Sequence, residues 1–148
     1  MTQRQEVSFK VYNKSNNTIS DKNTLPFNII DFIQGDGTYD TTDYKYIVQN
    51  AGTYLLGLSY NKKGNSDNGC VFIRVGRVID GASTTIVINR SQLISSENSC
   101  SFNTSTMYKL EIIDEVFATA FFGNPLMNLN SYTTDDTLNS FWGIRMDY

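Results

Sequence analysis

The sequence predicts an all-β protein, a sandwich of about ten strands built by one domain that spans residues 1–148. A chain of 148 residues is of single-domain size. Aromatic residues make up 13% of it, and aromatic side chains fit the half-buried face of a pleated sheet. Short runs of alternating apolar and polar residues recur, with turn residues about every 8–12 positions. No segment has a convincing helical period, so we expect an ordered sandwich from about residue 7 to residue 146 and no helix.

The first half of the chain shows the alternation most clearly. The expected elements are, in order, a half-buried strand with Val7, Phe9 and Val11 on one face, a polar loop at 13–23, an extended run at 25–33 with Pro26 at its start, a turn at 34–37, a strand with Tyr44, Tyr46 and Val48 on one face, and a strand with Tyr54, Leu56, Leu58 and Tyr60 on one face. Each strand is separated from the next by Gly, Asn or Asp, which suit turns.

The second half continues the pattern. The expected elements are a polar loop at 61–69, a strand with Val71, Ile73 and Val75 on one face, a turn at Asp80 and Gly81, a short strand at 84–89, a polar segment at 92–99, a strand at 100–104, a strand with Tyr108, Leu110 and Ile112 on one face, a turn at 114–115, a strand at 116–122, a long loop at 123–136 and a last strand at 141–146. Residues 116–122 are apolar on both faces, so we expect that strand at the centre of a sheet.

Composition excludes several classes of function. The net charge is −3, only 18% of residues are charged, and there is no basic run, so nucleic-acid binding is not expected. The chain has no His, which removes His-based triads, His general bases and most zinc sites. Because there is also no Gly-rich phosphate loop and no Cys–His pair, we predict a protein that is not an enzyme.

The ends and the cysteines say little about location. Residues 1–6 are polar and lack the apolar core of a signal peptide, and no later run is long enough to span a membrane. The expected location is therefore a particle surface, or an extracellular place reached from a longer precursor. Cys70 and Cys100 are expected to be free, partly buried thiols, although a bridge stays open. Four N-x-S/T sequons start at Asn13, Asn16, Asn89 and Asn103, as chance allows in an Asn-rich chain.

Several motifs together resemble a known family. They are Gly37-Thr38-Tyr39-Asp40 followed by Tyr44-Lys45-Tyr46-Ile47 and Ala51-Gly52-Thr53-Tyr54-Leu55-Leu56, with Val7-Ser8-Phe9-Lys10-Val11 and Leu25-Pro26-Phe27 before them and Asp114-Glu115-Val116 and Ser140-Phe141-Trp142-Gly143-Ile144 after them. In order and spacing they resemble the complement C1q globular-head family, within the tumour necrosis factor-like jelly rolls. The chain departs from the family pattern at turn positions, notably Asp43, Asn50 and Ile113.

The resemblance implies a ten-stranded jelly roll that assembles as a homotrimer and binds a partner without chemistry. The aromatic surplus independently favours a trimer, because a flat aromatic face left uncovered would be a sticky patch. The expected anchors of the core or of the trimer interface are Phe141, Trp142, Ile144, Met146, Tyr108 and Leu110. Side chains alternate along a strand, so Phe141 should face one way and Trp142, Ile144 and Met146 the other.

Candidate ligand-binding residues lie mainly in one polar loop, at Asn61, Lys62, Lys63, Asn65 and Asp67. Lys62 and Lys63, and also Arg74 and Arg77, could hold an acidic partner, although a solvated face is the favoured interpretation. Tyr44, Tyr46, Tyr54 and Tyr60 could stack on a sugar, although their alternation favours the core or a subunit interface.

A metal site has weaker support. Asp135 and Asp136, with Asp40 and Asp43, offer oxygen ligands of the kind that calcium takes, and some relatives of the resembled family bind calcium. No defined ligand spacing is present, so solvated loop acids are the favoured interpretation, and calcium is the one cofactor that stays a candidate.

Three functional hypotheses follow. The first is a head that binds a cell-surface protein or a glycan receptor, on a viral, phage or spore fibre or particle. The second is a secreted C1q-like lectin or ligand of a cellular organism, with a signal peptide upstream of this chain. The third is a structural capsid or cement protein without a ligand. None of the three predicts insertion into a membrane.

Overall fold

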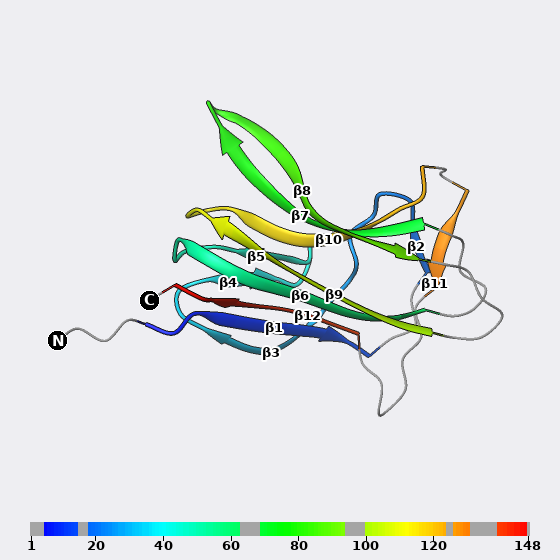
Figure 1. Cartoon of the computed structure of the whole chain (residues 1–148), viewed down its shortest axis with the longest axis horizontal. Helices are drawn as coiled ribbons and strands as arrows, with labels where there is room; N and C mark the ends of the chain where they lie inside the picture. The colour runs from blue at the N-terminus through cyan, green and yellow to red at the C-terminus, as the bar shows by residue number, and fades with distance from the viewer. Residues whose placement is uncertain are drawn as a thin grey trace.

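The computed structural model describes residues 5–14, 18–62, 69–93, 100–123, 126–130 and 139–147. These residues form twelve strands and no helix: β1 Ser8–Asn13, β2 Thr18–Ser20, β3 Ile29–Gln34, β4 Thr38–Asp40, β5 Lys45–Ile47, β6 Gly52–Lys62, β7 Gly69–Ile79, β8 Ala82–Leu93, β9 Cys100–Leu110, β10 Glu115–Phe121, β11 Asn128–Asn130 and β12 Asn139–Arg145. Ten of them build two five-stranded antiparallel sheets, which confirms the predicted all-β jelly-roll sandwich (Figure 1).

Each large sheet has a central strand that gives it a convenient name. The β12 sheet has the order β3-β1-β12-β6-β9, and the β10 sheet has the order β4-β5-β10-β7-β8. The two sheets lie in separate layers, and the β7–β8 hairpin rises away from the body of the sandwich (Figure 1). The strand that is apolar on both faces, β10, is indeed the middle strand of its sheet, as predicted.

The core lies between the two sheets and is aromatic at its centre. The ring of Phe9 stacks on that of Tyr46 with 4.0 Å between centroids, and its edge meets Phe141 at 5.4 Å. Phe27 contacts both Phe141 and Tyr60. The alternating residues predicted for the buried faces of β1, β6 and β7 are all in this core.

The tyrosines considered for sugar stacking lie in or against the core, as their alternation along the strands favoured. Tyr46, Tyr54 and Tyr60 are all 2% exposed or less and belong to the core, so they offer no sugar-stacking platform. Tyr44 lies in the turn before β5 with a φ of 60°, half-buried against the core.

Two short strands lie where loops were expected. Thr18–Ser20 falls in the predicted polar loop at 13–23, and Asn128–Asn130 falls in the predicted loop at 123–136. The two strands pair with each other, and Ile19 is buried at 4% exposure. A strand of three residues has no readable periodicity, and its partner is more than a hundred positions away, so nothing local indicated it.

Three boundaries also differ. The predicted strand at 84–89 is part of the longer β8, and the two strands expected at 100–104 and 108–112 are one strand, β9. β9 ends at Leu110, so Ile112 and Ile113 are exposed in a turn and the turn predicted at 114–115 comes earlier. The turn closes there because the Asp114 carboxylate accepts a hydrogen bond from the backbone N–H of Glu111 at 2.7 Å.

The hairpin between β7 and β8 is as predicted. Asp80 and Gly81, with φ of 51° and 79°, form its two-residue turn. Two consecutive residues with positive φ are the signature of the type I′ turn, which matches the twist of the strands.

Candidate assembly face and ligand-binding surfaces

The last strand, β12, divides the predicted anchor residues between two faces. Phe141 points into the core and is fully buried, whereas Trp142 is half-buried and Ile144 is 40% exposed on the opposite face. Met146, just beyond the strand, is 42% exposed, and its backbone N–H donates to the carbonyl of Thr53. Alternation about the buried Phe141 therefore places Trp142 and Ile144 on the outside of the β12 sheet.

The two anchors from β9 face inward. Leu110 is fully buried, and Tyr108 is half-buried and packs against the core. The guanidinium of Arg77 lies 5.7 Å from the centroid of the Tyr108 ring. These two residues therefore lie on the core side of β9, away from the outer face that Trp142 and Ile144 share.

Strand register brings further apolar side chains beside Trp142 and Ile144. Lys10 is paired with Phe32 on one side and Trp142 on the other, and Leu55 is paired with Ile144 and Met107. We call the outer apolar surface of the β12 sheet the assembly face; it consists of Phe32, Leu55, Met107, Trp142 and Ile144. Phe32 is 43% exposed and Met107 58% exposed. Sequence reasoning missed Phe32, Leu55 and Met107 as site residues, because only the register across all five strands of the β12 sheet brings them together.

Trp142 is seated by a glycine. Gly57 is its cross-strand partner in β6, and a Cβ atom at Gly57 would overlap the indole ring. The ring therefore lies directly across the backbone of β6. Any larger residue at position 57 would displace the indole of Trp142.

A groove of about 530 Å³ runs beside Trp142 on the assembly face. Its lining includes Lys10, Phe32 and Ile144, and also Ser8, whose hydroxyl donates to the side-chain oxygen of Gln34 at 2.8 Å. The groove is therefore apolar with a cation between two aromatic rings. It is a feature of the assembly face and not a separate site.

The candidate ligand-binding loop begins later than predicted, because β6 extends to Lys62. Asn61 is not an exposed loop residue: it lies in β6, is 5% exposed, and its backbone and side-chain N–H groups donate to the side-chain oxygen of Asn139 at 2.8 and 2.9 Å. Its role is to fasten the end of β6 to β12, so its assignment to a ligand-binding loop was wrong. Lys62 ends β6, and its side chain lies outside the described residues, as do Lys63, Asn65 and Asp67.

The candidate calcium ligands do not come together in the described part of the chain. Asp135 and Asp136 lie outside it. The Asp40 carboxylate accepts hydrogen bonds from the backbone N–H groups of Asp43 and Thr42 at 3.0 and 2.8 Å, and these bonds lower the pKa of Asp40. Asp40 thus closes its own turn, and no group of three potential metal ligands occurs among the described residues.

Cys70 is a free, buried thiol, as expected, and the Nε of Arg90 lies 3.2 Å from its sulfur. The side chain of Cys100 is outside the described residues. Of the sequons, Asn13 is 3% exposed, and its amide donates to the carbonyl of Pro26, so it offers no accessible glycan acceptor in the folded chain.

Arg74 and Arg77 have different environments. Arg77 forms an ion pair with Asp114 at 2.7 Å, and the Asp114 side chain is 2% exposed. Arg77 therefore has a structural role as the counter-ion of a buried carboxylate. The Asp114 hydrogen bond raises the pKa of Arg77. Arg74 instead lies across the outer face of β7, where its Nε donates to the hydroxyl of Thr119.

The fold has clear counterparts among solved structures, although no protein-family model and no curated protein sequence matches the chain. The Eiger TNF of S. frugiperda superposes with a TM-score of 0.72 at 9% identity, covering 97% of this chain and 94% of its own. The globular domain of zebrafish complement 1qA gives 0.68 at 12% identity, covering 96% and 98%. This chain has a C1q/TNF-like fold. Murine APRIL, with a TM-score of 0.72 at 12% identity and coverage of 95% and 99%, has the same C1q/TNF-like architecture.

Identities this low establish the fold alone. The comparison confirms the predicted jelly roll and says nothing of the ligand. No helix able to cross a membrane is present in the part of the chain that the structure describes.

Proposed function

We propose that this C1q/TNF-like chain is the subunit of a homotrimeric recognition domain, a head that binds a cell-surface protein or a glycan and performs no chemistry. The single observation that carries the proposal is the assembly face. Its five large apolar side chains lie on one continuous sheet surface, and three of them are 40% exposed or more. Soluble proteins seldom leave such a surface exposed to water, and contact with further copies of the same chain would bury it.

The seating of Trp142 strengthens this interpretation. A glycine inside a strand normally weakens a sheet. Gly57, however, lacks the side chain that would displace the Trp142 indole, so the ring packs against the backbone of β6 on the outside of the molecule. Aromatic residues held rigidly at a surface are typical anchors of protein interfaces. Threefold assembly is what the C1q and tumour necrosis factor resemblance implies, and it would multiply weak contacts through effective concentration.

We place the head on a viral, phage or spore particle. A secreted lectin or ligand of a cellular organism is the second candidate, favoured by the fold shared with complement 1qA and APRIL. Neighbouring virion genes would support the first, and a precursor with an upstream signal peptide the second. A ligand-free capsid or cement protein is the remaining alternative.

Sedimentation velocity on matched variants tests the assembly face. Ile144→Glu places a charge on the face, and Val87→Glu makes the same change at a strand residue of the β10 sheet that is 45% exposed, against 40% for Ile144. We expect wild type and Val87→Glu to sediment as trimers and Ile144→Glu as a folded monomer. If Ile144→Glu stays trimeric with unchanged dissociation, the assembly face is not the interface and the proposal fails.

A further inference from the structure

The outer face of the β10 sheet, on the other side of the sandwich, carries a second kind of surface. Two hollows of about 280 and 440 Å³ adjoin there and share Lys45, Thr85 and Phe117 in their walls. We call these two adjoining hollows, which lie over β5, β10, β7 and β8, the β10 groove. The residues that matter in it are Lys22, Lys45, Arg74, Thr85, Phe117 and Thr119.

The depth of the groove comes from a missing side chain. Gly76 lies between Glu115 and Thr85 in the strand register. The atoms nearest to a Cβ atom at Gly76 would belong to Glu115, at 3.7 Å or more, which is ordinary van der Waals contact, so the position has room for a larger residue. The glycine is therefore not required by packing, and its effect is to leave the floor of the groove open.

The cations that line the groove are not all neutralised. Lys45 has Glu115 at 3.3 Å and Arg77 has Asp114 at 2.7 Å. Arg74 makes no ion pair within the described residues. It is half-buried, its Nε donates to Thr119 at 2.7 Å, and its guanidinium carbon lies 4.9 Å from the centroid of the Phe72 ring. Desolvation by burial lowers the pKa of Arg74, as expected for a cation without a counter-ion.

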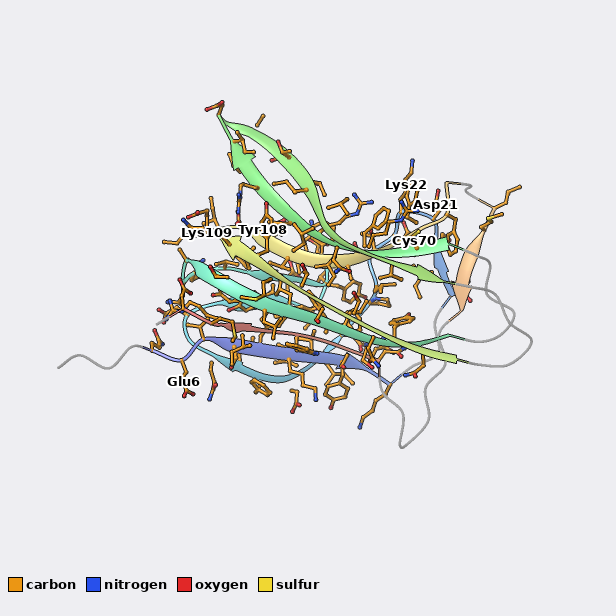
Figure 2. All side chains as sticks on the ribbon, in the orientation of Figure 1. Glu6, Asp21, Lys22, Cys70, Tyr108 and Lys109 are labelled. Carbon is orange, nitrogen blue, oxygen red and sulfur yellow. The ribbon has the colours of Figure 1, made fainter. Side chains whose placement is uncertain are left out.

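A second unpaired cation lines the same hollow. Lys22 makes no ion pair in the described part of the chain, and the neighbouring Asp21 carboxylate accepts hydrogen bonds from the backbone N–H groups of Phe122 and Gly123. Its side chain extends outward at one end of the sheet (Figure 2). Arg90 adds positive charge nearby, with its guanidinium carbon 6.0 Å from the ring of Phe72. A chain with a net charge of −3 thus concentrates free positive charge on this face.

The remaining lining indicates the chemistry of the ligand. Thr24 and Thr85 present hydroxyl groups, which both donate and accept hydrogen bonds and so suit a ligand rich in hydroxyls, whereas Thr119 is 3% exposed and positions Arg74. Phe121 is half-buried and supplies apolar ring surface, and the ring of the buried Phe117 lies beneath Lys45. We propose that the β10 groove binds an acidic saccharide, with Arg74 and Lys22 holding its carboxylate or sulfate group and the threonines its hydroxyls. This inference rests on the proposed recognition function and names its ligand class.

An acidic peptide fits the groove less well. A peptide that binds a sheet usually adds a strand at a free edge, where backbone groups are unpaired. The floor of the β10 groove is made by β10 and β7, which are paired on both sides. Recognition here therefore relies on side chains alone, which suits a compact, polyhydroxylated anion.

Isothermal titration of the purified trimer with four probes tests the proposal. The probes are 3′-sialyllactose, 3′-sulfolactose, neutral lactose and hexaglutamate. We expect one or both acidic sugars to bind at least tenfold more tightly than lactose and hexaglutamate, and the better of the two identifies the anion as carboxylate or sulfate. Failure of both acidic sugars to bind at millimolar concentration, equal binding of lactose, or a preference for hexaglutamate would overturn the proposal.

Matched variants locate the binding. Arg74→Gln removes the free charge, and Gly76→Val fills the groove with a residue that favours strands. We expect each to weaken the acidic sugar at least tenfold, while Lys109→Gln, which removes an exposed cation from the β12 sheet, changes affinity less than twofold. Unchanged binding by Arg74→Gln with an unaltered melting temperature would contradict the assignment, even if Gly76→Val does not fold.

The groove lies within one chain, so it can be separated from assembly. The folded monomer expected from Ile144→Glu should bind a monovalent acidic sugar with the wild-type dissociation constant. If the wild-type protein is a monomer that binds the acidic sugar, the proposed trimer is refuted and the proposed ligand site stands. If it is a trimer that does not bind the sugar, the ligand site is refuted and the trimer stands.

Discussion

At the scale of single residues, the molecule depends on a few side chains whose partners are distant in sequence. Trp142 keeps its position because residue 57 has no side chain. Asp114, 2% exposed, is held by Arg77, whose side chain is 22% exposed, and it also closes the turn before β10. Each pair can be tested by a substitution that leaves the rest of the sheet unchanged.

Gly57→Val should both destabilise the subunit and weaken the trimer. The new side chain would push the indole of Trp142 off β6, and overpacking of this kind costs about 1–3 kcal/mol. Urea unfolding gives the loss in the free energy of unfolding, and gel filtration gives the change in assembly. Gly76→Ala, at a strand glycine with free space, is the control and should be close to neutral; equal effects of the two would refute the seating of Trp142.

Asp114→Ala should cost about 3 kcal/mol in the free energy of unfolding. The change leaves the partly buried Arg77 without its counter-ion and the N–H of Glu111 without its acceptor. Glu115→Ala breaks the more exposed pair with Lys45, whose side chains are 31% and 45% exposed, and should cost less than about 1 kcal/mol. Similar losses for the two variants in urea titrations would show that burial does not distinguish the pairs.

At the scale of the element, β12 is the strand that joins the core to the assembly face. It pairs with β1 on one side and β6 on the other, supplies Phe141 to the core and carries Trp142 and Ile144 on the assembly face. Long alternating runs predicted strands such as this one well, because each has a buried face several residues long. The three-residue β2 and β11 could not be predicted, since their pairing is decided by the tertiary fold.

Deleting residues 140–148 should abolish the soluble, folded trimer. The deletion opens two strand edges in the middle of the β12 sheet and removes Phe141 from the core, and that side chain alone is worth about 3–5 kcal/mol. Circular dichroism and light scattering check the outcome, with Phe141→Ala as the graded variant. A truncated chain that remains a trimer with an unchanged melting temperature would show that β12 is not a central strand.

At the scale of the whole molecule, the two sheets lie in separate layers (Figure 1), and their outer faces differ: that of the β12 sheet is apolar and that of the β10 sheet is cationic. Assembly through the first would leave the second free for a ligand. The sequence predicted the alternation of residues 141–146 but not their neighbours, because Phe32, Leu55 and Met107 reach them only through strand register. Asn61 was misassigned for the same reason, since its partner Asn139 lies 78 positions away.

The buried tyrosines predict a loss of stability in alkali. Burial raises the pKa of Tyr39, Tyr46 and Tyr54 above the ordinary value of about 10. The unfolded chain therefore loses these protons at a lower pH than the folded one, so their contribution to stability is complete below about pH 10 and declines as the pH rises beyond it. Melting temperatures measured from pH 8 to pH 11 should fall steeply only at the upper end; a flat profile would contradict the burial of these hydroxyls.

We propose that the apolar face of the β12 sheet brings three copies of the chain together. Light scattering of the wild-type protein at micromolar concentration measures the mass of the assembly. We expect three times the 16.7 kDa of the chain. A mass of one chain across the whole concentration range would contradict it.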